Sequence, residues 1–341
     1  MSVLSRPLVT IVTPVRNGAA YLAECIESVL NQTYADWQYT IVNNASTDAT
    51  LEIALRYSAL DDRVRVVTYE DVVGVIENHN RALSHVSESS KYAKVLAADD
   101  WLFPECVRRM VALAEAEPTV GVVGAYMLSG DEAQCCIKYD SLSYRRIVIP
   151  GHEACRHHLL KAGRDYFGVP TSLLYRAELV RKSPSFFPNI REHADVSVFY
   201  ECLRTTDFGF VHQVLSFERI HKTALSTQAR KIFSYEGSRL LDLCHYGPQY
   251  LTESELSVRV TEAIRGHYRL LASGLINFEG KKFRDYHTAI LAESGHPVSV
   301  VRLAAVVCLR LVALCLSPGV TLEKMFGRLK TSLVSEQKPK A

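Results

Sequence analysis

The stretch LVTIVT, residues 8–13, decides the fold class of this chain. It is short, apolar and rich in β-branched residues, which is typical of a strand buried on both faces of a parallel sheet. A loop at Pro14–Gly18 follows, and apolar residues then recur at helical spacing from Leu22 to Leu30. A buried strand followed by an amphipathic helix begins a βαβ unit, so a parallel sheet requires this pattern to repeat.

The pattern does repeat along the first half of the chain. We expect further strands at WQYTIV (37–42), VRVVTY (64–69), YAKVL (92–96) and VGVVGAY (120–126). Helices are expected at Leu51–Leu60, around Asn78–Val86 and at Pro104–Ala116. This alternation predicts an α/β fold with a doubly wound, mostly parallel sheet and helices on both faces.

The second half of the chain is less regular. Residues 166–176 are marked by glycine and proline, 191–204 should be helical, and 208–221 have the pattern of an extended strand pair. Beyond Thr227 the sequence is mostly helical. A chain of 341 residues can bury a full core and then continue. We therefore expect a sheet domain over 1–227 and a helical C-terminal region over 228–341.

Composition places the chain among soluble globular proteins, with 48% apolar and 22% charged residues. The net charge of +2 gives no reason to expect a nucleic-acid partner. Nine cysteines without a C-x-x-C pair indicate reduced thiols packed as small hydrophobes. Pro7 and the first strand also come too early for a signal peptide. Together these features predict a cytoplasmic protein.

Spacing excludes three familiar kinds of site. No G-x-G-x-x-G follows the first strand and no G-x-x-x-x-G-K-[ST] occurs, which excludes a dinucleotide fingerprint and a P-loop. HEACRH, residues 152–157, resembles a zinc-protease motif, but Arg156 stands where the second histidine is needed. His152 and His157 would not share one face of a helix, so the zinc interpretation is discarded.

Two adjacent acids follow the strand in KVLAADDWLFP, residues 94–104. Asp99 and Asp100 repel each other and are costly to desolvate unless a cation joins them. They indicate either a metal site or a solvated turn that caps a helix, since Pro104 suits a first helical turn. Ligands of doubly wound sheets bind beyond the carboxyl ends of the strands, where Asn43–Asp48 should also lie. The two stretches therefore predict one crevice.

The polar residues expected at strand ends could transfer a group from a nucleotide-activated donor. The two acids and His221 would bind Mg²⁺ or Mn²⁺, which would hold phosphate oxygens. Arg219 suits a diphosphate because its guanidinium can form bidentate hydrogen bonds. Asp195 is left to act as a general base.

The motifs and their order resemble the family 2 glycosyltransferases, which have the GT-A fold. TIVTPVRNGAAYLAECIESVLNQTY (10–34) resembles their opening strand, loop and helix, and IVNNASTDAT (41–50) resembles their nucleotide-contacting segment. GVIENHNRAL (74–83) matches the segment before the metal motif, and LAADDWLFP (96–104) resembles the D-x-D metal motif. FGVPTSLLYR (167–176), EHADVSVFYECL (192–203) and FERIHKTALS (217–226) resemble the glycine loop, the base segment and the terminal R-x-H.

The resemblance, which covers residues 7–226, implies an inverting, metal-dependent glycosyltransferase. It would move a sugar from a nucleotide-diphosphate sugar, with a UDP-sugar preferred, to a hydroxyl of a glycan or lipid-linked acceptor in surface polysaccharide or glycan synthesis. By this resemblance Asp195 is the base, and Asp100, Asp99 and His221 hold the metal, with Asp100 in direct contact. The implied donor-binding residues are Thr13, Pro14, Arg16, Asn17, Asn43, Asn44, Ser46, Asp48, Asn78, Arg81, Asp99, Gly168 and Arg219.

The chain departs from the family pattern at four positions. Asn43 and Asn44 replace acids that help to hold the base and ribose, Ala97 replaces the first acid of the metal motif, and Ala194 replaces the glutamate of the base motif. A non-catalytic glycan-binding subunit on the same fold therefore stays open as an alternative, as does a sugar nucleotidyltransferase. Asp48 is equally interpreted as a helix cap, and Glu192 is the substitute base.

The C-terminal region contains the most apolar stretch of the chain, VSVVRLAAVVCLRLVALCL (298–316). From Lys281 onward ten Lys/Arg face four Asp/Glu, so this part carries +6 and the preceding residues carry −4. Arg302 and Arg310 interrupt a membrane span, and they lie within about 80° of each other on a helix. Residues 281–330 therefore indicate either a helix on an anionic membrane surface or a core helix. In the first case the protein is peripheral at the inner face of the membrane.

Overall fold

The computed structural model describes residues 6–131, 133–140, 142–160, 167–183, 185–188, 193–221 and 232–316. The chain divides into two compact units. The first, called here the sheet unit, holds the described residues up to 221 and residues 245–255. The second, called here the helical unit, holds residues 232–244 and the described residues from 256 onward. The boundary expected at residue 227 stays a prediction.

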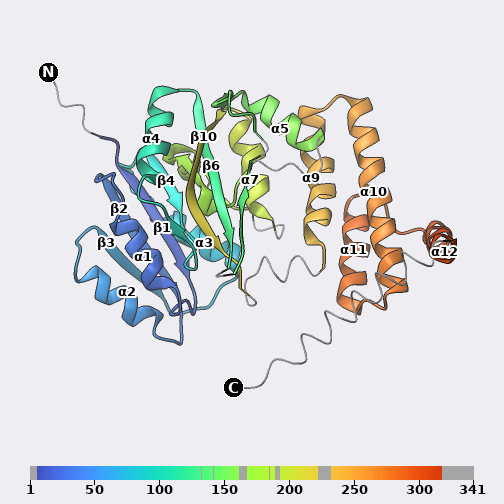
Figure 1. The fold of residues 1–341 in the computed structure, drawn as a ribbon, viewed down its shortest axis with the longest axis horizontal. Coiled ribbons are helices and arrows are strands. Elements are labelled where there is room, and N and C mark those ends of the chain that lie inside the picture. The colour runs from blue at the N-terminus through green and yellow to red at the C-terminus, as the bar shows by residue number, and fades with distance from the viewer. Residues whose placement is uncertain are drawn as a thin grey trace. The chain divides into compact units, whose positions relative to one another are not determined.

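A single sheet of ten strands is the framework of the sheet unit (Figure 1). Its main path runs β3-β2-β1-β4-β9-β6-β10-β5. The first four are parallel to one another: β1 (Val9–Val15), β2 (Trp37–Asn44), β3 (Val64–Tyr69) and β4 (Tyr92–Val95). Their carboxyl ends therefore meet at one edge of the sheet, as the sequence predicts.

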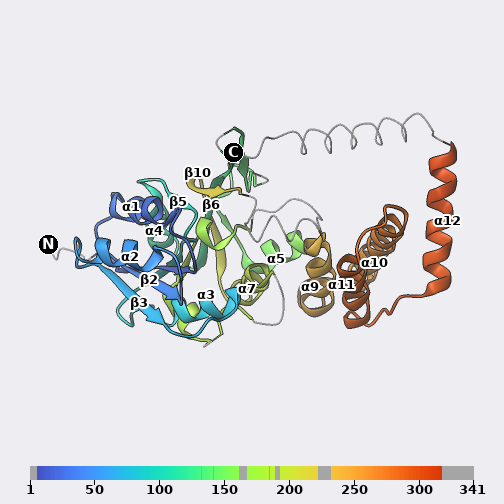
Figure 2. The ribbon, with the colours of Figure 1, turned by 90° about the horizontal axis from the view of Figure 1, so that it is seen from below.

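Helices cover both faces of these parallel strands. They are α1 (Leu22–Leu30), α2 (Thr50–Ser58), α3 (Val75–Leu83) and α4 (Cys106–Ala116). Side chains of α1, α2 and α4 share one apolar core with the alternate residues Ile11, Tyr39 and Ile41 of the sheet. Figure 2 shows α1 and α4 on one side of the sheet and α3 on the other. Every residue of β1 is buried, which confirms the prediction of a strand covered on both faces.

The later strands complete the sheet with mixed directions. β6 (Val120–Gly130) is parallel to β10 (Asp207–Arg219), and β9 (Leu173–Arg176) is antiparallel to both β4 and β6. The prediction of a strand pair over 208–221 is wrong, because β10 is one long strand whose register with β6 shifts between Val211 and Val214. Short pieces lie at the margins: β5 (Trp101–Leu102), β7 (Cys135–Lys138), β8 (Val148–Ile149) and the 3₁₀ turn η1 (Pro170–Ser172).

The described residues of the sheet unit also form α5 (Gly151–Leu160), α6 (Ala177–Arg181) and α7 (Ala194–Leu203). All nine cysteines are free thiols, as the sequence indicates. The expectation that they pack as small hydrophobes is wrong for Cys135, Cys136, Cys308 and Cys315, which are exposed.

The helical unit contains most of α9 (Ser234–Tyr250) and α10 (Glu253–Ile276), with α11 (Lys281–Glu293) and α12 (Val300–Leu316). It has an apolar core of its own, built around Leu240, Tyr268, Leu271 and Leu291. None of the described helices combines the length and the apolar composition that crossing a bilayer would require.

Candidate active site

A cavity of about 650 Å³ opens at the carboxyl ends of β1 and β4. It is lined by the loop after β1, the acidic turn after β4, the segment before β9 and the end of β10. Seven of the predicted site residues line it: Pro14, Arg16, Asn17, Asp99, Asp100, Arg219 and His221. The structure therefore brings four distant parts of the chain together at the strand ends. The stretch 43–48, which the sequence places in the same crevice as Asp99 and Asp100, does not line this cavity.

Asp100 is the most constrained acid in the cavity, with 5% of its surface exposed. The Thr171 hydroxyl donates to Oδ2 at 2.7 Å, and the backbone N–H of Arg219 donates to Oδ1 at 3.0 Å. Burial, reinforced by the neighbouring Asp99, raises the pKa of the Asp100 carboxyl well above its usual range, although both hydrogen bonds oppose this. The two donors orient the carboxyl without supplying a full positive charge.

Asp99 is more exposed than Asp100, with 35% of its side chain accessible. Its Oδ2 lies 2.9 Å from Nε2 of His221, which follows β10. The His221 ring in turn lies 5.4 Å, centroid to centroid, from the ring of Tyr21 at the start of α1. The imidazole and one carboxylate of the predicted metal set are therefore in direct contact.

The guanidinium of Arg219 is held between two aromatic rings. It lies 4.5 Å from the centroid of Tyr21 and 5.0 Å from that of Trp101. Its Nη2 forms an ion pair with Glu24 of α1, and its Nε donates to the backbone oxygen of Asp99 at 3.3 Å. Stacking on aromatic faces fixes the plane of a guanidinium, so Arg219 is presented to the cavity in one orientation.

The loop after β1 is fastened to the loop after β2 by side-chain hydrogen bonds. Asn17 has a left-handed backbone with φ 54°, and its side chain accepts from the N–H of Thr47 at 2.8 Å. The hydroxyl of Ser46 accepts from the N–H of Asn17 at 2.9 Å. Ser46 thus braces the loop that lines the cavity, while Asn17 both braces and lines it.

Asp48 lies just before α2, whose N-cap residue is Ala49, and its carboxylate binds the first N–H of the helix without occupying the cap position. Its Oδ1 accepts from the N–H of Thr50 at 3.0 Å, and its Oδ2 accepts from the N–H of Ala19 at 3.2 Å. Burial acts to raise the pKa of Asp48, but the hydrogen bonds from Thr50 and Ala19 outweigh it and lower the pKa. The carboxylate also ties α2 to the loop after β1.

Asn43 and Asn44 lie inside β2 rather than beyond its end, and both are buried. Asn43 accepts from the N–H of Ser46 at 3.2 Å. The Asn44 amide donates to the oxygen of Val73 and accepts from its N–H, at 2.9 and 3.0 Å. Asparagine can do both because its amide is donor and acceptor together, which a carboxylate is not.

Four other predicted donor-binding residues do not line the cavity. Thr13 faces the core, where the Tyr39 hydroxyl donates to it at 2.8 Å. Asn78 is buried, and its Oδ1 has no partner among the described residues. Arg81 forms an ion pair with Asp71 and stacks over Tyr69. Gly168 packs so tightly that a Cβ there would overlap the Ser172 hydroxyl.

Asp195 lies in the first turn of α7 and is half-buried. It is not among the described residues that line the cavity. Its charge contributes to raising the pKa of Tyr175 on β9, which is otherwise raised mainly by burial. Glu192, the substitute base, lies outside the described residues.

The sequence analysis did not identify several residues that stabilise the segments around Asp99 and Asp100. Lys94 on β4 is fully buried, and its Nζ donates to the carbonyl oxygens of Thr171 and Leu173 at 2.7 and 3.0 Å. A lysine inside an apolar strand is itself a signal that could have singled out Lys94. Nothing local marks Thr171, Tyr21 or Glu24, because their roles depend on partners distant in the chain.

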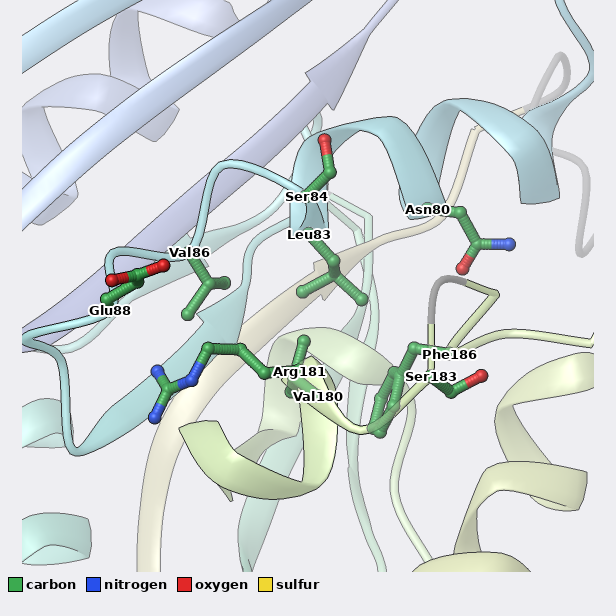
Figure 3. A pocket seen from close by; sticks show the side chains of 9 residues that line it. All are labelled: Asn80, Leu83, Ser84, Val86, Glu88, Val180, Arg181, Ser183 and Phe186. Carbon is green, nitrogen blue, oxygen red and sulfur yellow. The ribbon is translucent and has the colours of Figure 1, made fainter.

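A second cavity, of about 400 Å³, lies between the end of α3 and α6 in the sheet unit (Figure 3). The amide of Asn80 both donates to and accepts from the backbone of Phe187. The guanidinium of Arg181 donates to the backbone oxygens of Ser87 and Ser90. Since these polar groups already serve the fold, this cavity is a weaker candidate for the site.

Several residues of the large cavity could contribute to a metal site. Among the described residues, no three His, Cys, Asp or Glu side chains converge on one point. Asp99, Asp100 and His221 nevertheless give two carboxylates and an imidazole on one wall. Mg²⁺ is usually held by one or two carboxylates together with water and substrate phosphates, so this donor set fits such an ion.

The sequence profile of glycosyl transferase family 2 matches residues 10–180, which is half of the chain. The chain belongs to this family. EpsE of Bacillus subtilis (strain 168), named as a glycosyltransferase, is 35% identical over 129 residues, which are 38% of this chain and 46% of EpsE. TuaG of the same organism is 29% identical over 127 residues, 37% of this chain and 50% of TuaG. The match therefore spans about half the length of these relatives.

Solved structures of two transferases share the fold. The chain covers 80% of residues 1–349 of S. aureus TarS in complex with UDP-GlcNAc, with a TM-score of 0.62, 14% identity and 84% of this chain aligned. The mannosyltransferase PcManGT of Pyrobaculum calidifontis, in complex with GDP-Man and Mn²⁺, gives a TM-score of 0.54 at 17% identity over 98% of this chain and 89% of PcManGT. At such identities the likeness concerns the fold, and it confirms the predicted GT-A architecture.

Proposed function

We propose that this family 2 protein is an inverting glycosyltransferase that uses a nucleotide-diphosphate sugar and a divalent metal. The observation that carries the proposal is the cavity at the strand ends, where Asp99, Asp100, Arg219 and His221 meet. A buried carboxyl beside a second acid favours a bound cation. A stacked guanidinium at the same wall favours a phosphate group.

The metal is proposed to be Mg²⁺ or Mn²⁺, held by Asp99, Asp100 and His221. When bound, it would supply positive charge for the diphosphate that leaves the sugar. Arg219 would orient that diphosphate, since its guanidinium plane is fixed by Tyr21 and Trp101. Thr171 and the N–H of Arg219 would keep the Asp100 carboxyl oriented during the reaction.

Asp195 is proposed to take the proton from the acceptor hydroxyl as that oxygen attacks the anomeric carbon. One bond forms between the acceptor oxygen and this carbon, while the bond to the diphosphate breaks on the opposite side. The proton passes to the Asp195 carboxylate, and the electron pair leaves with the diphosphate. A positioned carboxylate of this kind typically contributes about 10²–10⁴-fold to the rate.

For the donor we propose a UDP-sugar, and for the acceptor a glycan or lipid-linked glycan. The complex of TarS with UDP-GlcNAc supports the first assignment by analogy of fold, whereas PcManGT binds GDP-Man. TuaG, named for teichuronic acid biosynthesis, supports a role in surface polysaccharide synthesis. A protein working on such acceptors would operate in the cytoplasm, at the inner face of the membrane.

A non-catalytic subunit on the same fold is the second candidate. It is favoured by Asn43 and Asn44, whose side chains brace loops in place of acids that the family uses for the nucleotide.

Hydrolysis of UDP- and GDP-sugars by the full chain, with Mn²⁺, with Mg²⁺ and with chelator, tests these candidates. Metal-stimulated release of the nucleoside diphosphate that is lost in Asp100→Asn supports the transferase. Donor binding without turnover supports the subunit. Formation of the nucleoside triphosphate and sugar 1-phosphate when pyrophosphate is added would point to a nucleotidyltransferase.

A further inference from the structure

Four arginines gather around a cavity of about 480 Å³ in the helical unit. Arg265 and Arg269 come from α10, one turn apart, and Arg302 and Arg310 come from α12. The remaining lining is aromatic or apolar: Tyr268, Val306 and Leu309. The cavity therefore joins a cluster of positive charge to apolar surface.

The position of α12 against α10 is fixed by specific contacts. The Tyr268 hydroxyl accepts from the N–H of Ser299 at 2.8 Å. The guanidinium of Arg302 lies 4.3 Å from the centroid of the Tyr268 ring. Leu303 and Val306 pack against the core of the helical unit. The packing of α12 against α10 therefore keeps the four arginines close together although their charges repel one another.

No acid lines the cavity, and none of the four arginines has a carboxylate partner among the described residues. Neighbouring cations differ, since Arg259 pairs with Glu262 and Lys281 pairs with Asp285. Guanidinium groups bind phosphate oxygens by paired, charge-assisted hydrogen bonds. The cluster can therefore bind an anionic group.

The outer face of α12 is apolar and unburied. None of its residues is buried, and Val301, Leu309 and Leu316 are 81%, 70% and 77% exposed. At 3.6 residues per turn these three lie on the side away from Leu303. The other residues of that side are Ala304, Ala305, Cys308, Val312 and Cys315, all exposed. A core helix, the second sequence interpretation of 298–316, would not leave such a face uncovered within the unit.

We propose that α10 and α12 bind the surface of an anionic phospholipid bilayer. The arginine cavity takes the lipid phosphate groups, and the outer face of α12 enters the boundary between headgroups and acyl chains. A second copy of this chain fits less well, because pairing two α12 outer faces would bring Arg302, which flanks that face beside Leu309, toward the Arg302 of the other copy. This surface differs from the one expected over 281–330, because it includes Arg265 and Arg269 of α10. Lys324, Arg328 and Lys330 lie outside the described residues.

The test is co-sedimentation of the full chain with vesicles of phosphatidylcholine alone or mixed with phosphatidylglycerol. Wild type should bind the mixed vesicles and should bind less as salt rises. Each basic residue near an anionic surface contributes about fivefold, so Arg265→Gln with Arg269→Gln should weaken binding about 30-fold. Leu309→Ser with Val312→Ser should weaken it at least about tenfold, because apolar area no longer enters the bilayer.

The matched control removes two cations from α4 in the sheet unit, by Arg108→Gln with Arg109→Gln. Both side chains are about half exposed and lie outside the helical unit, so this variant should keep wild-type binding. Equal binding to neutral and mixed vesicles, or wild-type binding by the Arg265/Arg269 variant, would overturn the proposal. A dimer in solution that the Leu309/Val312 variant abolishes would assign the face to a second copy instead. Donor hydrolysis without vesicles should be unchanged in all variants, so this test fails or succeeds separately from the proposed sugar transfer.

Discussion

The substitution Lys94→Met tests whether the buried ammonium of Lys94 stabilises the segment before β9 that lines the active-site cavity. Lys94 crosses from β4 to the segment before β9, where its buried ammonium donates to the carbonyl oxygens of Thr171 and Leu173. Its third proton points toward Met110, whose Sδ lies 3.9 Å away. Burial lowers the pKa of Lys94, because a charged ammonium inside the protein is unfavourable in free energy. Methionine keeps the length of the side chain and removes both donors.

The expected loss of stability follows from the groups left behind. Each buried carbonyl without a donor costs about 1–3 kcal/mol, so two give about 2–6 kcal/mol. Removing the buried charge offsets part of this loss of stability, because an ammonium group no longer has to be desolvated on folding. We expect the free energy of unfolding to fall by about 3 kcal/mol. Thr171 should also shift, and activity should fall because its hydroxyl orients Asp100.

Equilibrium unfolding in urea, followed by donor hydrolysis on the folded fraction, measures both effects. Lys91→Met is the matched control, because Lys91 precedes the same strand but is half exposed and pairs with Glu115 at 2.7 Å. An exposed pair of this kind is worth about 0–1 kcal/mol, so the control should stay close to wild type. If Lys94→Met is as stable and as active as Lys91→Met, the ammonium does not hold the wall.

Three further predictions concern charge. Asp100→Asn should abolish metal-stimulated donor hydrolysis. The variant should melt at or above the wild-type temperature, since the substitution removes a buried carboxyl next to Asp99. A melting temperature well below that of wild type would contradict this. Asp195→Asn should bind donor normally and transfer sugar at least about 100-fold more slowly, whereas a near wild-type rate would leave Glu192 as the base to test. Burial, aided by His267, lowers the pKa of His287 to about 4, below the roughly 6.5 of an unfolded histidine. The contribution of neutral His287 to the free energy of unfolding is therefore fully present above about pH 6.5 and is lost as pH falls toward 4. Thermal melts should show this loss of stability in acid, and His287→Gln should reduce it.

The first half of the fold could be predicted from the sequence because its signals are local. Apolar runs such as 8–13 and helical periodicity from Leu22 to Leu30 depend only on neighbouring residues. The single strand β10 could not be recognised, since its continuity depends on pairing with β6 across irregular register at Val211 and Val214. Strand pairing between distant segments is a tertiary property, and it overrode the local pattern.

The order of motifs along the chain was enough to predict which residues meet at the candidate site. The hydrogen-bond and ion-pair partners of individual residues could not be predicted in this way. Asp99, Asp100, Arg219 and His221 meet as the motif order implies. Asn44 could not be recognised as a brace, because its partner is the backbone of Val73. The same holds for Arg81, whose partner Asp71 lies in an exposed loop. Residue types alone do not show which polar groups a fold has already used.

The burial of Asp100 explains why donor and metal binding should be coupled. In the protein alone, this carboxyl is desolvated beside Asp99, and within the described part of the chain its hydrogen-bond donors are one hydroxyl and one backbone N–H. A divalent cation would relieve this by favouring the charged form of both acids. The cation in turn needs further oxygen ligands, which a diphosphate supplies and the described protein residues do not. Each ligand would therefore complete the site for the other, and the rise in melting temperature with both present should exceed the sum of the rises with each alone.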